Sequence, residues 1–171
     1  STAKESEITE ALSLLSQCPV DVIYIVDSYG SMYMEQVDDL ADKYLKMAED
    51  HGKSVGMHAH NNQQLAFANT IAALTRGVSY LDSTIGGMGR GAGNCSSEQL
   101  LGFLKNPKYD LIPILQFLEK HIIPLKKSGV VWGYNIPYLL TGQTNQHPRS
   151  AIAATKEKRT DFLNFLLELN D

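Results

Sequence analysis

The chain has 171 residues, a formal net charge of −4 at pH 7 and a pI near 5.7, so it is about one domain long and has no excess of positive charge to attract a polyanion. Its one basic cluster, Lys156, Lys158 and Arg159, is typical of a solvated helix face, and we expect no nucleic-acid partner. No apolar run approaches the ~20 residues that span a bilayer, and we expect no membrane partner. Two cysteines without metal-site spacing, Cys18 and Cys95, indicate reduced thiols in a cytoplasmic protein.

The first elements alternate between helix and strand. A helix is predicted for Glu5–Gln17, ending where a residue before proline avoids the α region. The almost wholly apolar run Val20–Val26 predicts a strand that is buried on both faces, as in a parallel sheet. Apolar residues spaced three and four apart predict an amphipathic helix over Met34–His51, and Gly52 closes it.

The same unit then repeats. Ser54–His58 and Val78–Asp82 are predicted strands, with a helix over Leu65–Arg76 between them. A glycine-rich loop at 86–93 follows the second of these strands. The serines after it are candidate N-caps for a helix that reaches about Leu104. Strands that alternate with helices indicate βαβ units and a parallel sheet.

The rest of the chain is mostly helical. Helices are predicted for Leu111–Lys126 and Asp161–Leu169, with a candidate fourth strand at Val130–Val131. Three or four βα units are about half of a (β/α)8 barrel, a TIM barrel, which typically needs ~250 residues. We therefore expect this chain to be the second half of a longer α/β barrel protein. Residues 1–106 would supply its C-terminal βα units, and residues 107–171 would supply closing helices and a C-terminal extension.

The strongest chemical signal is the pair His58 and His60, within Gly-Met-His-Ala-His-Asn-Asn at the end of a predicted strand. Side chains at i and i+2 of a strand point to the same face, and barrel enzymes build their sites at the carboxyl ends of the strands. Two neutral imidazoles side by side suit a divalent transition ion. The spacing alone fits a hydrogen-bonded histidine pair equally well.

A second signal follows one βα unit later, in the segment Leu81–Asn94. It holds five glycines within eight residues, which lets the backbone take positive φ and approach a ligand closely. No Gly-Lys-Ser/Thr follows, so it is not a Walker loop, and it fits a dinucleotide fingerprint poorly. The amide of Asn94 is a candidate metal ligand, although its position alone favours a helix cap.

Taken together, these motifs resemble the HMG-CoA lyase-like (DRE-type) family of barrel metalloenzymes. The resemblance runs from about Glu7 to Phe103 and is closest to the 4-hydroxy-2-oxovalerate aldolases. The motifs that carry it are Asp27-Ser28, the His-Ala-His-Asn-Asn of 58–62, and the Asp-Ser-Thr-Ile-Gly-Gly and Gly-Ala-Gly-Asn of 82–94. The Gly-Glu-Arg loop of the related synthases and the cysteine-containing loop of the CoA lyases do not occur here.

The resemblance implies site residues. It makes His58 and His60 metal ligands, and Asn94 a ligand or a neighbour of the ligands. It places Asp27 and Ser28 near the substrate and Tyr134 at the catalytic centre; Tyr138 is an alternative to Tyr134, and core packing an alternative for both. The family's carboxylate ligand, its neighbouring arginine and a histidine base belong to the first barrel strand, and no matching motif occurs in this chain.

The resemblance also implies a function, which is metal-dependent cleavage or formation of a C–C bond in a 4-hydroxy-2-oxo acid, giving pyruvate and an aldehyde. Mn²⁺ is the expected ion, with Mg²⁺, Co²⁺ and Zn²⁺ as alternatives, and a homo-oligomer is expected. The alternatives are acyl-CoA lyase or synthase chemistry, or a non-catalytic half-barrel. Asn61 replaces a histidine common in the aldolases, and residues 141–149 also depart from them. These departures leave the substrate and an aldehyde dehydrogenase partner in doubt, and we expect the isolated chain to be inactive.

Overall fold

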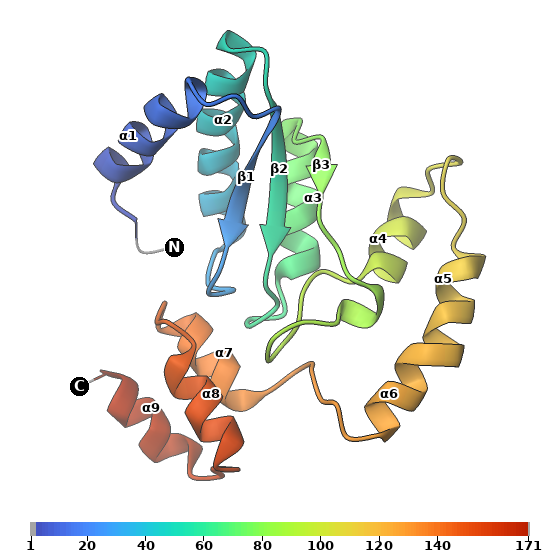
Figure 1. Ribbon diagram of the computed structural model, residues 1–171. Helices are drawn as coiled ribbons and strands as arrows, with labels where there is room; N and C mark the ends of the chain where they lie inside the picture. Colours follow the sequence, from blue (N-terminus) through green and yellow to red (C-terminus); the bar gives the residue numbers. More distant parts are fainter. Residues whose placement is uncertain (1–2, 171) are drawn as a thin grey trace.

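The computed structural model describes residues 3–170 and has a three-stranded parallel sheet at its centre (Figure 1). The strands β1 (Val22–Asp27), β2 (Ser54–Ala59) and β3 (Tyr80–Leu81) lie side by side in that order. Helix α2 (Met34–Asp50) connects β1 to β2, and α3 (Ala66–Arg76) connects β2 to β3. The predicted alternation of strands and helices is confirmed, with element ends shifted by one or two residues.

The two faces of the sheet differ in how they are covered. Ile25, Val55 and Met57 are buried and belong to one hydrophobic core with residues of α2 and α3. Residues of the opposite parity face the other way, and there Val26 and Tyr80 remain 43% and 47% exposed. In a closed barrel the helices cover the outside of the sheet, so the open face corresponds to the barrel interior.

The helices around the sheet follow the predicted amphipathic pattern. The buried residues of α2 recur every four and seven positions, at Val37, Ala41 and Ala48. Helix α3 stops at Gly77, whose φ of 111° lies in the left-handed region that glycine adopts at little cost. Helix α1 (Glu5–Ser16) packs beside α2.

A bent helical rod follows α4 (Ser97–Leu104) and stands to one side of the sheet (Figure 1, yellow to orange). It consists of α5 (Ile112–Phe117), a π-helical segment η2 (Leu118–Ile122) and α6 (Ile123–Lys127), so the helix predicted there is confirmed. The π segment ends just before Pro124. Proline lacks the N–H that would continue the α-helical hydrogen bonds, and a π bulge accommodates that loss.

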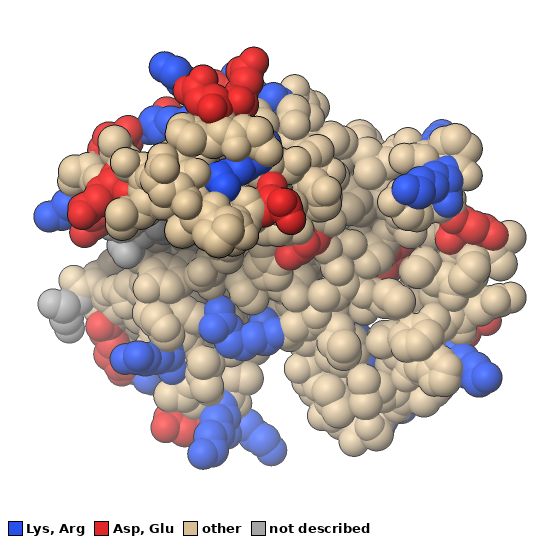
Figure 2. Space-filling model, turned by 45° about the horizontal axis from the view of Figure 1, so that its top comes forward, with Lys and Arg blue, Asp and Glu red and all other residues tan. Residues whose placement is uncertain are grey.

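The face of the molecule seen in Figure 2 shows scattered charges of both signs with wide uncharged areas between them. The rod has many exposed apolar side chains, namely Ile112, Leu115, Phe117, Ile123 and Leu125. The rod therefore buries little of its own apolar surface.

The strand predicted at Val130–Val131 is wrong. These residues form no strand in the structure, and the side chain of Val131 is 86% exposed. The chain turns at Gly129, where φ is +99°, and is then anchored by Trp132, whose indole Nε1 donates a 2.8 Å hydrogen bond to the carbonyl oxygen of Gly86. This anchor draws the segment across the glycine-rich loop and away from the edge of β3, so it has no strand to pair with.

The C-terminal region is a small helical unit made of α7 (Ile136–Gln143), α8 (Arg149–Lys156) and α9 (Phe162–Asn170). The sequence predicted α9 but missed α7 and α8. The unit has its own small core, formed by Ala154, Phe165 and Leu169 with Leu140 packed against it. In Figure 1 it lies beyond the carboxyl ends of the strands.

Helix α7 approaches those strand ends closely. A Cβ added at Gly142 would lie 3.1 Å from the Cβ of Asn62 and 3.2 Å from the carbonyl oxygen of Gly30, so glycine permits the contact. A hydrogen bond of 2.8 Å from Ser31 Oγ to Asn145 Oδ1 adds to it. Within residues 3–170, no helix is both long enough and apolar enough to cross a membrane.

Candidate metal site at the carboxyl ends of the strands

His58 and His60 lie at the carboxyl end of β2, and their side chains are neighbours. His58 belongs to the strand and His60 follows it directly, so both side chains point to the open face of the sheet. Their ring centroids are 5.2 Å apart with an interplanar angle of 81°. This edge-to-face arrangement leaves room for nitrogen atoms of both rings to approach one small ion.

Asp82, directly after β3, fixes the orientation of His58. The register of the sheet pairs Met57 with Leu81, which brings the residues that follow them side by side. Nδ1 of His58 lies 3.1 Å from Oδ2 of Asp82. The carboxylate accepts this hydrogen bond, so Nδ1 carries the proton and Nε2 keeps a free lone pair. Metal-binding histidines commonly have this arrangement, in which a carboxylate fixes the tautomer.

Tyr24 reaches the same carboxylate across the inner face of the sheet. Burial raises the pKa of Tyr24, and the charge of Asp82 and a hydrogen bond to it raise that pKa further. The tyrosine ring crosses over Gly56, where an added Cβ would overlap the ring. Glycine at position 56 therefore permits a connected set of Tyr24, Asp82 and His58.

His60 and Asn94 each present an unpartnered atom beside this set. Nδ1 of His60 and Oδ1 of Asn94 are buried and accept or donate no hydrogen bond within residues 3–170. The two residues are joined as a backbone bridge, and Nδ2 of Asn94 donates to the carbonyl oxygen of Met88 at 3.1 Å. Burial lowers the pKa of His60, and the charges of Arg90 and His58 lower it further. The ring is thus kept neutral, which is the form that binds metal.

The donors present fit a divalent ion but do not complete its coordination. Two imidazoles and an amide oxygen are suitable ligands for a transition ion, and the unpartnered atoms of His60 and Asn94 are satisfied when one binds. Within residues 3–170, no group of three or more His, Cys, Asp and Glu side chains is arranged to hold a metal. Imidazole and amide ligands supply no negative charge to balance a divalent ion, so a carboxylate from elsewhere would strengthen the set His58, His60 and Asn94.

Asp27 and Ser28 stand at the end of β1 in different environments. Asp27 is fully buried, and its two carboxylate oxygens accept 3.0 Å hydrogen bonds from the backbone N–H groups of Ser31 and Met32. This carboxylate holds the β1–α2 loop in place, and the geometry gives no support to a substrate contact through it. Ser28 is exposed, and its carbonyl oxygen accepts a 2.9 Å hydrogen bond from Nη2 of Arg90.

Tyr134 and Tyr138 lie on the far side of the glycine-rich loop. Tyr134 is 62% exposed and lines a separate cavity of about 300 Å³ with Trp132 and Tyr138. The ring of Tyr138 is buried against Gly91, and burial raises the pKa of its hydroxyl, while the charge of Arg90 opposes that rise. The structure therefore brings neither tyrosine to the histidine pair, and Tyr138 is a packing residue.

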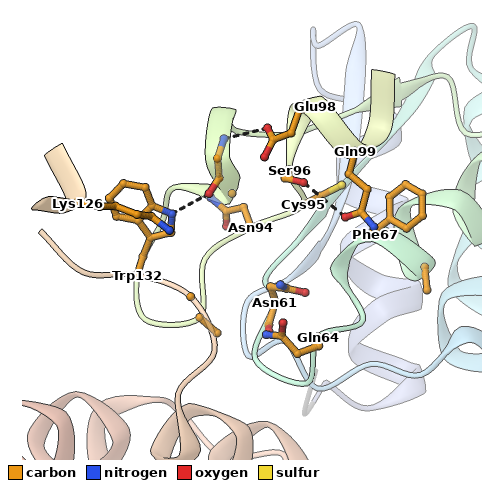
Figure 3. A pocket seen from close by; sticks show the side chains of 15 residues that line it. Asn61, Gln64, Phe67, Asn94, Cys95, Ser96, Glu98, Gln99, Lys126 and Trp132 are labelled. Atoms are coloured by element: carbon orange, nitrogen blue, oxygen red, sulfur yellow. Dashed lines mark hydrogen bonds between the residues drawn. The ribbon is translucent and has the colours of Figure 1, made fainter. Parts of the chain in front are cut away.

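A cavity of about 370 Å³ opens beside the site, between α3, α4 and the glycine-rich loop (Figure 3). Asn61 and Asn94, the neighbours of His60 in the sequence and in the backbone bridge, form part of its wall. On the opposite wall Trp132 donates to the carbonyl oxygen of Gly86, with the ammonium of Lys126 4.5 Å from the indole ring. The histidines themselves do not line this cavity.

Sequence reasoning missed two residues of this site, Asp82 and Arg90. Both lie within the segment Leu81–Asn94, but their roles depend on which strands are neighbours. Asp82 meets His58 because of the register between β2 and β3. Arg90 meets the loop after β1 because the glycine-rich loop folds back over the strand ends. The signal available in the sequence for Asp82 was a carboxylate as the last residue of a predicted strand, Val78–Asp82.

The fold and the site together define a partial (β/α)8 barrel with a histidine pair at the carboxyl ends of its strands. The model of the HMGL-like family matches residues 1–117, so the chain belongs to that family, and the predicted fold class is confirmed. The chain is 41% identical over 143 residues to a 4-hydroxy-2-oxovalerate aldolase of Pelotomaculum thermopropionicum, covering 78% of this chain and 41% of that protein. It is 40% identical over 173 residues to the enzyme of the same name from Thermus thermophilus, covering 95% and 48%.

Solved structures agree with this assignment. The N-terminal domain of a proposed aldolase from Bacteroides vulgatus superposes with a TM-score of 0.69 at 31% identity, covering 90% of this chain and 52% of that one. Pyruvate carboxylase of Rhizobium etli gives a TM-score of 0.67 at 15% identity, covering 92% and 16%, which shows a shared fold alone. The chain spans about half the length of the curated relatives it matches.

Proposed function

We propose that the complete protein carrying this chain is a divalent-metal-dependent aldolase. It would cleave a C–C bond in a 4-hydroxy-2-oxo acid to give pyruvate and an aldehyde, or form that bond in the reverse condensation. The observation that carries this proposal is the pair His58 and His60 at a strand end, with Asp82 orienting His58, in a chain whose relatives are named 4-hydroxy-2-oxovalerate aldolase.

In this proposal His58 and His60 hold the ion, and Asn94 contributes its unpartnered amide oxygen. A bound divalent ion supplies a Lewis acid that lowers the cost of the enolate left when the C–C bond breaks. Asp82 keeps Nδ1 of His58 protonated, so that Nε2 remains available to bind. Mn²⁺ is the ion we propose, with Mg²⁺, Co²⁺ and Zn²⁺ as alternatives, and the remaining carboxylate ligand would come from the first strand of the barrel.

The remaining side chains of the mouth shape access to the reacting atoms. Ser28 is exposed at the rim, where it is available to the substrate, while Asp27 holds the loop behind it. The glycine-rich loop brings backbone close to the candidate ligand Asn94, since a Cβ at Gly89 would lie 2.6 Å from its amide nitrogen. Tyr134 remains a proposed catalytic residue, which would require the Trp132–Tyr134 segment to adopt another position in the complete barrel.

We also propose the organisation that goes with this function. Residues 1–106 would supply βα units of the barrel, and residues 107–171 would supply closing helices and a C-terminal extension. The substrate is a small 2-oxo acid, and the complete protein would be a homo-oligomer. Localisation in the cytoplasm is part of the same proposal. We propose no aldehyde dehydrogenase partner.

The test is turnover of a 2-oxo acid by the complete gene product. With Mn²⁺ present, 4-hydroxy-2-oxopentanoate should release pyruvate, which a coupled lactate dehydrogenase assay detects. Removing the metal with a chelator should stop the reaction, and adding Mn²⁺ back should restore it. If the protein turned over acyl-CoA thioesters and released no pyruvate from the hydroxy-oxo acid, the aldolase proposal would be wrong.

A further inference from the structure

Arg90 projects from a part of the glycine-rich loop that is tightly packed on both sides. It lies between Gly89, where a Cβ would lie 2.6 Å from the amide nitrogen of Asn94, and Gly91, where a Cβ would overlap the ring of Tyr138. The φ of Gly91 is +57°, a backbone conformation that other residues rarely adopt. The carbonyl oxygen of Arg90 also accepts a 3.0 Å hydrogen bond from the N–H of Gly93. The side chain therefore starts from a defined position at the rim of the site.

From that position the side chain of Arg90 crosses the carboxyl ends of the strands. Its loop begins after β3, and its guanidinium donates to the carbonyl oxygen of Ser28, directly after β1, at 2.9 Å. The end of β2, where His60 lies, is between these two points in the sheet order.

Most of the hydrogen-bonding capacity of Arg90 is unused. A guanidinium has five N–H donors, and the carbonyl oxygen of Ser28 takes one of them. Arg90 is exposed and forms no ion pair within residues 3–170. The two carboxylates of the mouth have other partners, because Asp27 accepts from backbone N–H groups and Asp82 accepts from His58. The mouth thus holds a cation with free donors and no anion beside it.

We propose that Arg90 is a specificity-determining residue, which binds a carboxylate on the aldehyde portion of the substrate. The protein would then prefer 4-hydroxy-2-oxo acids that carry a second carboxylate at the end remote from the 2-oxo group. This inference rests on the proposed function, because the 2-oxo end is assigned to His58 and His60. Arg90 is hydrogen-bonded to the loop after β1, at Ser28. From there it would bind the end of the substrate remote from the 2-oxo group. A planar guanidinium binds a carboxylate through two parallel hydrogen bonds.

The experiment compares two aldehydes with the same number of carbon atoms in the condensation direction. The complete gene product with Mn²⁺ and pyruvate is assayed with succinic semialdehyde, which is anionic, and with butanal, which is neutral. In Arg90→Ala, kcat/KM for succinic semialdehyde should fall by roughly 10–100-fold, mainly through KM, because a charge-assisted contact is lost. For butanal it should change by less than about threefold. Arg90→Lys should recover part of the preference, since it restores the charge but not the fork.

The matched control is Arg76→Ala. It also removes one arginine, but from the C-terminal end of α3, where Arg76 pairs with Asp38 and Asp42. This variant should leave kcat/KM unchanged for both aldehydes. Equal losses for both aldehydes in Arg90→Ala would mean that Arg90 only holds the loop, and unchanged kinetics with succinic semialdehyde would mean that it binds no anion; either result overturns the inference.

A binding measurement separates this inference from the proposed reaction. If the wild-type protein condenses neither aldehyde and also releases no pyruvate from 4-hydroxy-2-oxopentanoate, the proposed function fails; in either case titration calorimetry with succinate on the metal-free protein then decides the role of Arg90. Weaker succinate binding by Arg90→Ala than by Arg76→Ala supports an anion site at the rim. Equal or absent binding by the wild-type protein and Arg90→Ala overturns it.

Discussion

The sheet with its flanking helices and the region after α4 are stabilised in different ways. The first has one continuous core that joins β1, β2, α2 and α3, including Ile25, Val37, Val55, Met57 and Ala73. The second has one cluster of three buried residues of its own, shares another with Ala92 of the glycine-rich loop, and leaves the apolar side chains of the α5–α6 rod exposed. The two regions meet at the glycine-rich loop, where Tyr138 packs on Gly91 and Trp132 bonds to Gly86. The histidine pair thus rests on the better packed region, and the rim of the site rests on the other.

The largest effect is expected at the strand end of the first region. Replacing both His58 and His60 by Ala should abolish binding of Mn²⁺, because two of the ligands are lost, while the fold remains since both side chains lie on the open face of the sheet. Titration calorimetry measures the binding, and far-ultraviolet circular dichroism checks the fold. A matched double variant, His51→Ala with His121→Ala, removes two exposed histidines elsewhere and should bind like the wild type. Unchanged affinity in the first variant would remove the metal site from this strand end.

Packing substitutions test the comparison of the two regions directly. Met57→Ala empties a fully buried position of the continuous core and should lower the free energy of unfolding by roughly 2–5 kcal/mol. Leu169→Ala acts in a three-residue cluster, where the side chain is 8% exposed, and should cost roughly 2 kcal/mol, at the low end of the range. Urea unfolding of the purified protein measures both. Equal costs would show that the two regions are packed equally well, contrary to the comparison.

The same difference decides what the sequence could predict. Apolar runs and amphipathic spacing predicted β1, β2, α2 and α3, because each of these elements buries a full face. Helices α7 and α8 were missed since each has only 8 residues, and since a proline such as Pro137 breaks a helix when it lies in the interior. In fact Pro137 lies in the first turn of α7, where proline is favoured, and Asn135 caps that turn by accepting a hydrogen bond from the N–H of Tyr138.

The site divides in a similar way. The histidine pair was predicted from one strand alone, because side chains two residues apart in a strand lie on the same face. Asp82 was not predicted as the partner of His58, because that contact depends on the register between two strands. Arg90 depends on a loop whose path is set by positive φ at Gly91 and Gly93, and glycine permits many paths. Tyr134 was chosen by resemblance, and in the structure it lies apart from the histidines.

The contact between the two regions is tested by Gly91→Ala. This change forces a φ of +57° on alanine and pushes its Cβ into the ring of Tyr138, so it should cost roughly 2–4 kcal/mol and loosen α7 from the glycine-rich loop. Compared with the wild type, the variant should show faster hydrogen exchange in residues 136–143 and unchanged exchange in β2. Gly52→Ala is the control, because its φ is +64° but nothing lies within 4 Å of the added Cβ. It should cost only the backbone strain, about 1–2 kcal/mol. Similar costs for both variants would mean that the contact with Tyr138 contributes little.

The smallest effect is expected at the far end of the second region, where Arg159 bonds to the carboxylates of Asp161 and Glu168. Hydrogen bonds from Arg159 lower the pKa of Asp161 below its usual 3.8 and that of Glu168 below its usual 4.5. A carboxyl whose folded pKa is lowered stabilises the fold above its unfolded pKa, and this contribution disappears as pH falls through the folded pKa.

Arg159→Ala should therefore lower the melting temperature slightly at pH 7, and its difference from the wild type should shrink as pH falls below the usual pKa of the two carboxyls, 3.8 and 4.5. Both carboxylates are exposed and Arg159 is half-buried, so 1 M salt should also reduce the difference at pH 7. Arg149→Ala removes an exposed arginine of α8 that has no ion pair within residues 3–170, and it should show no such pH dependence. Melting curves from pH 7 to pH 2 measure all three proteins. A difference that stayed constant with pH would mean that Arg159 acts by packing over the ring of Phe165, whose centroid is 5.2 Å away, and not by its charge.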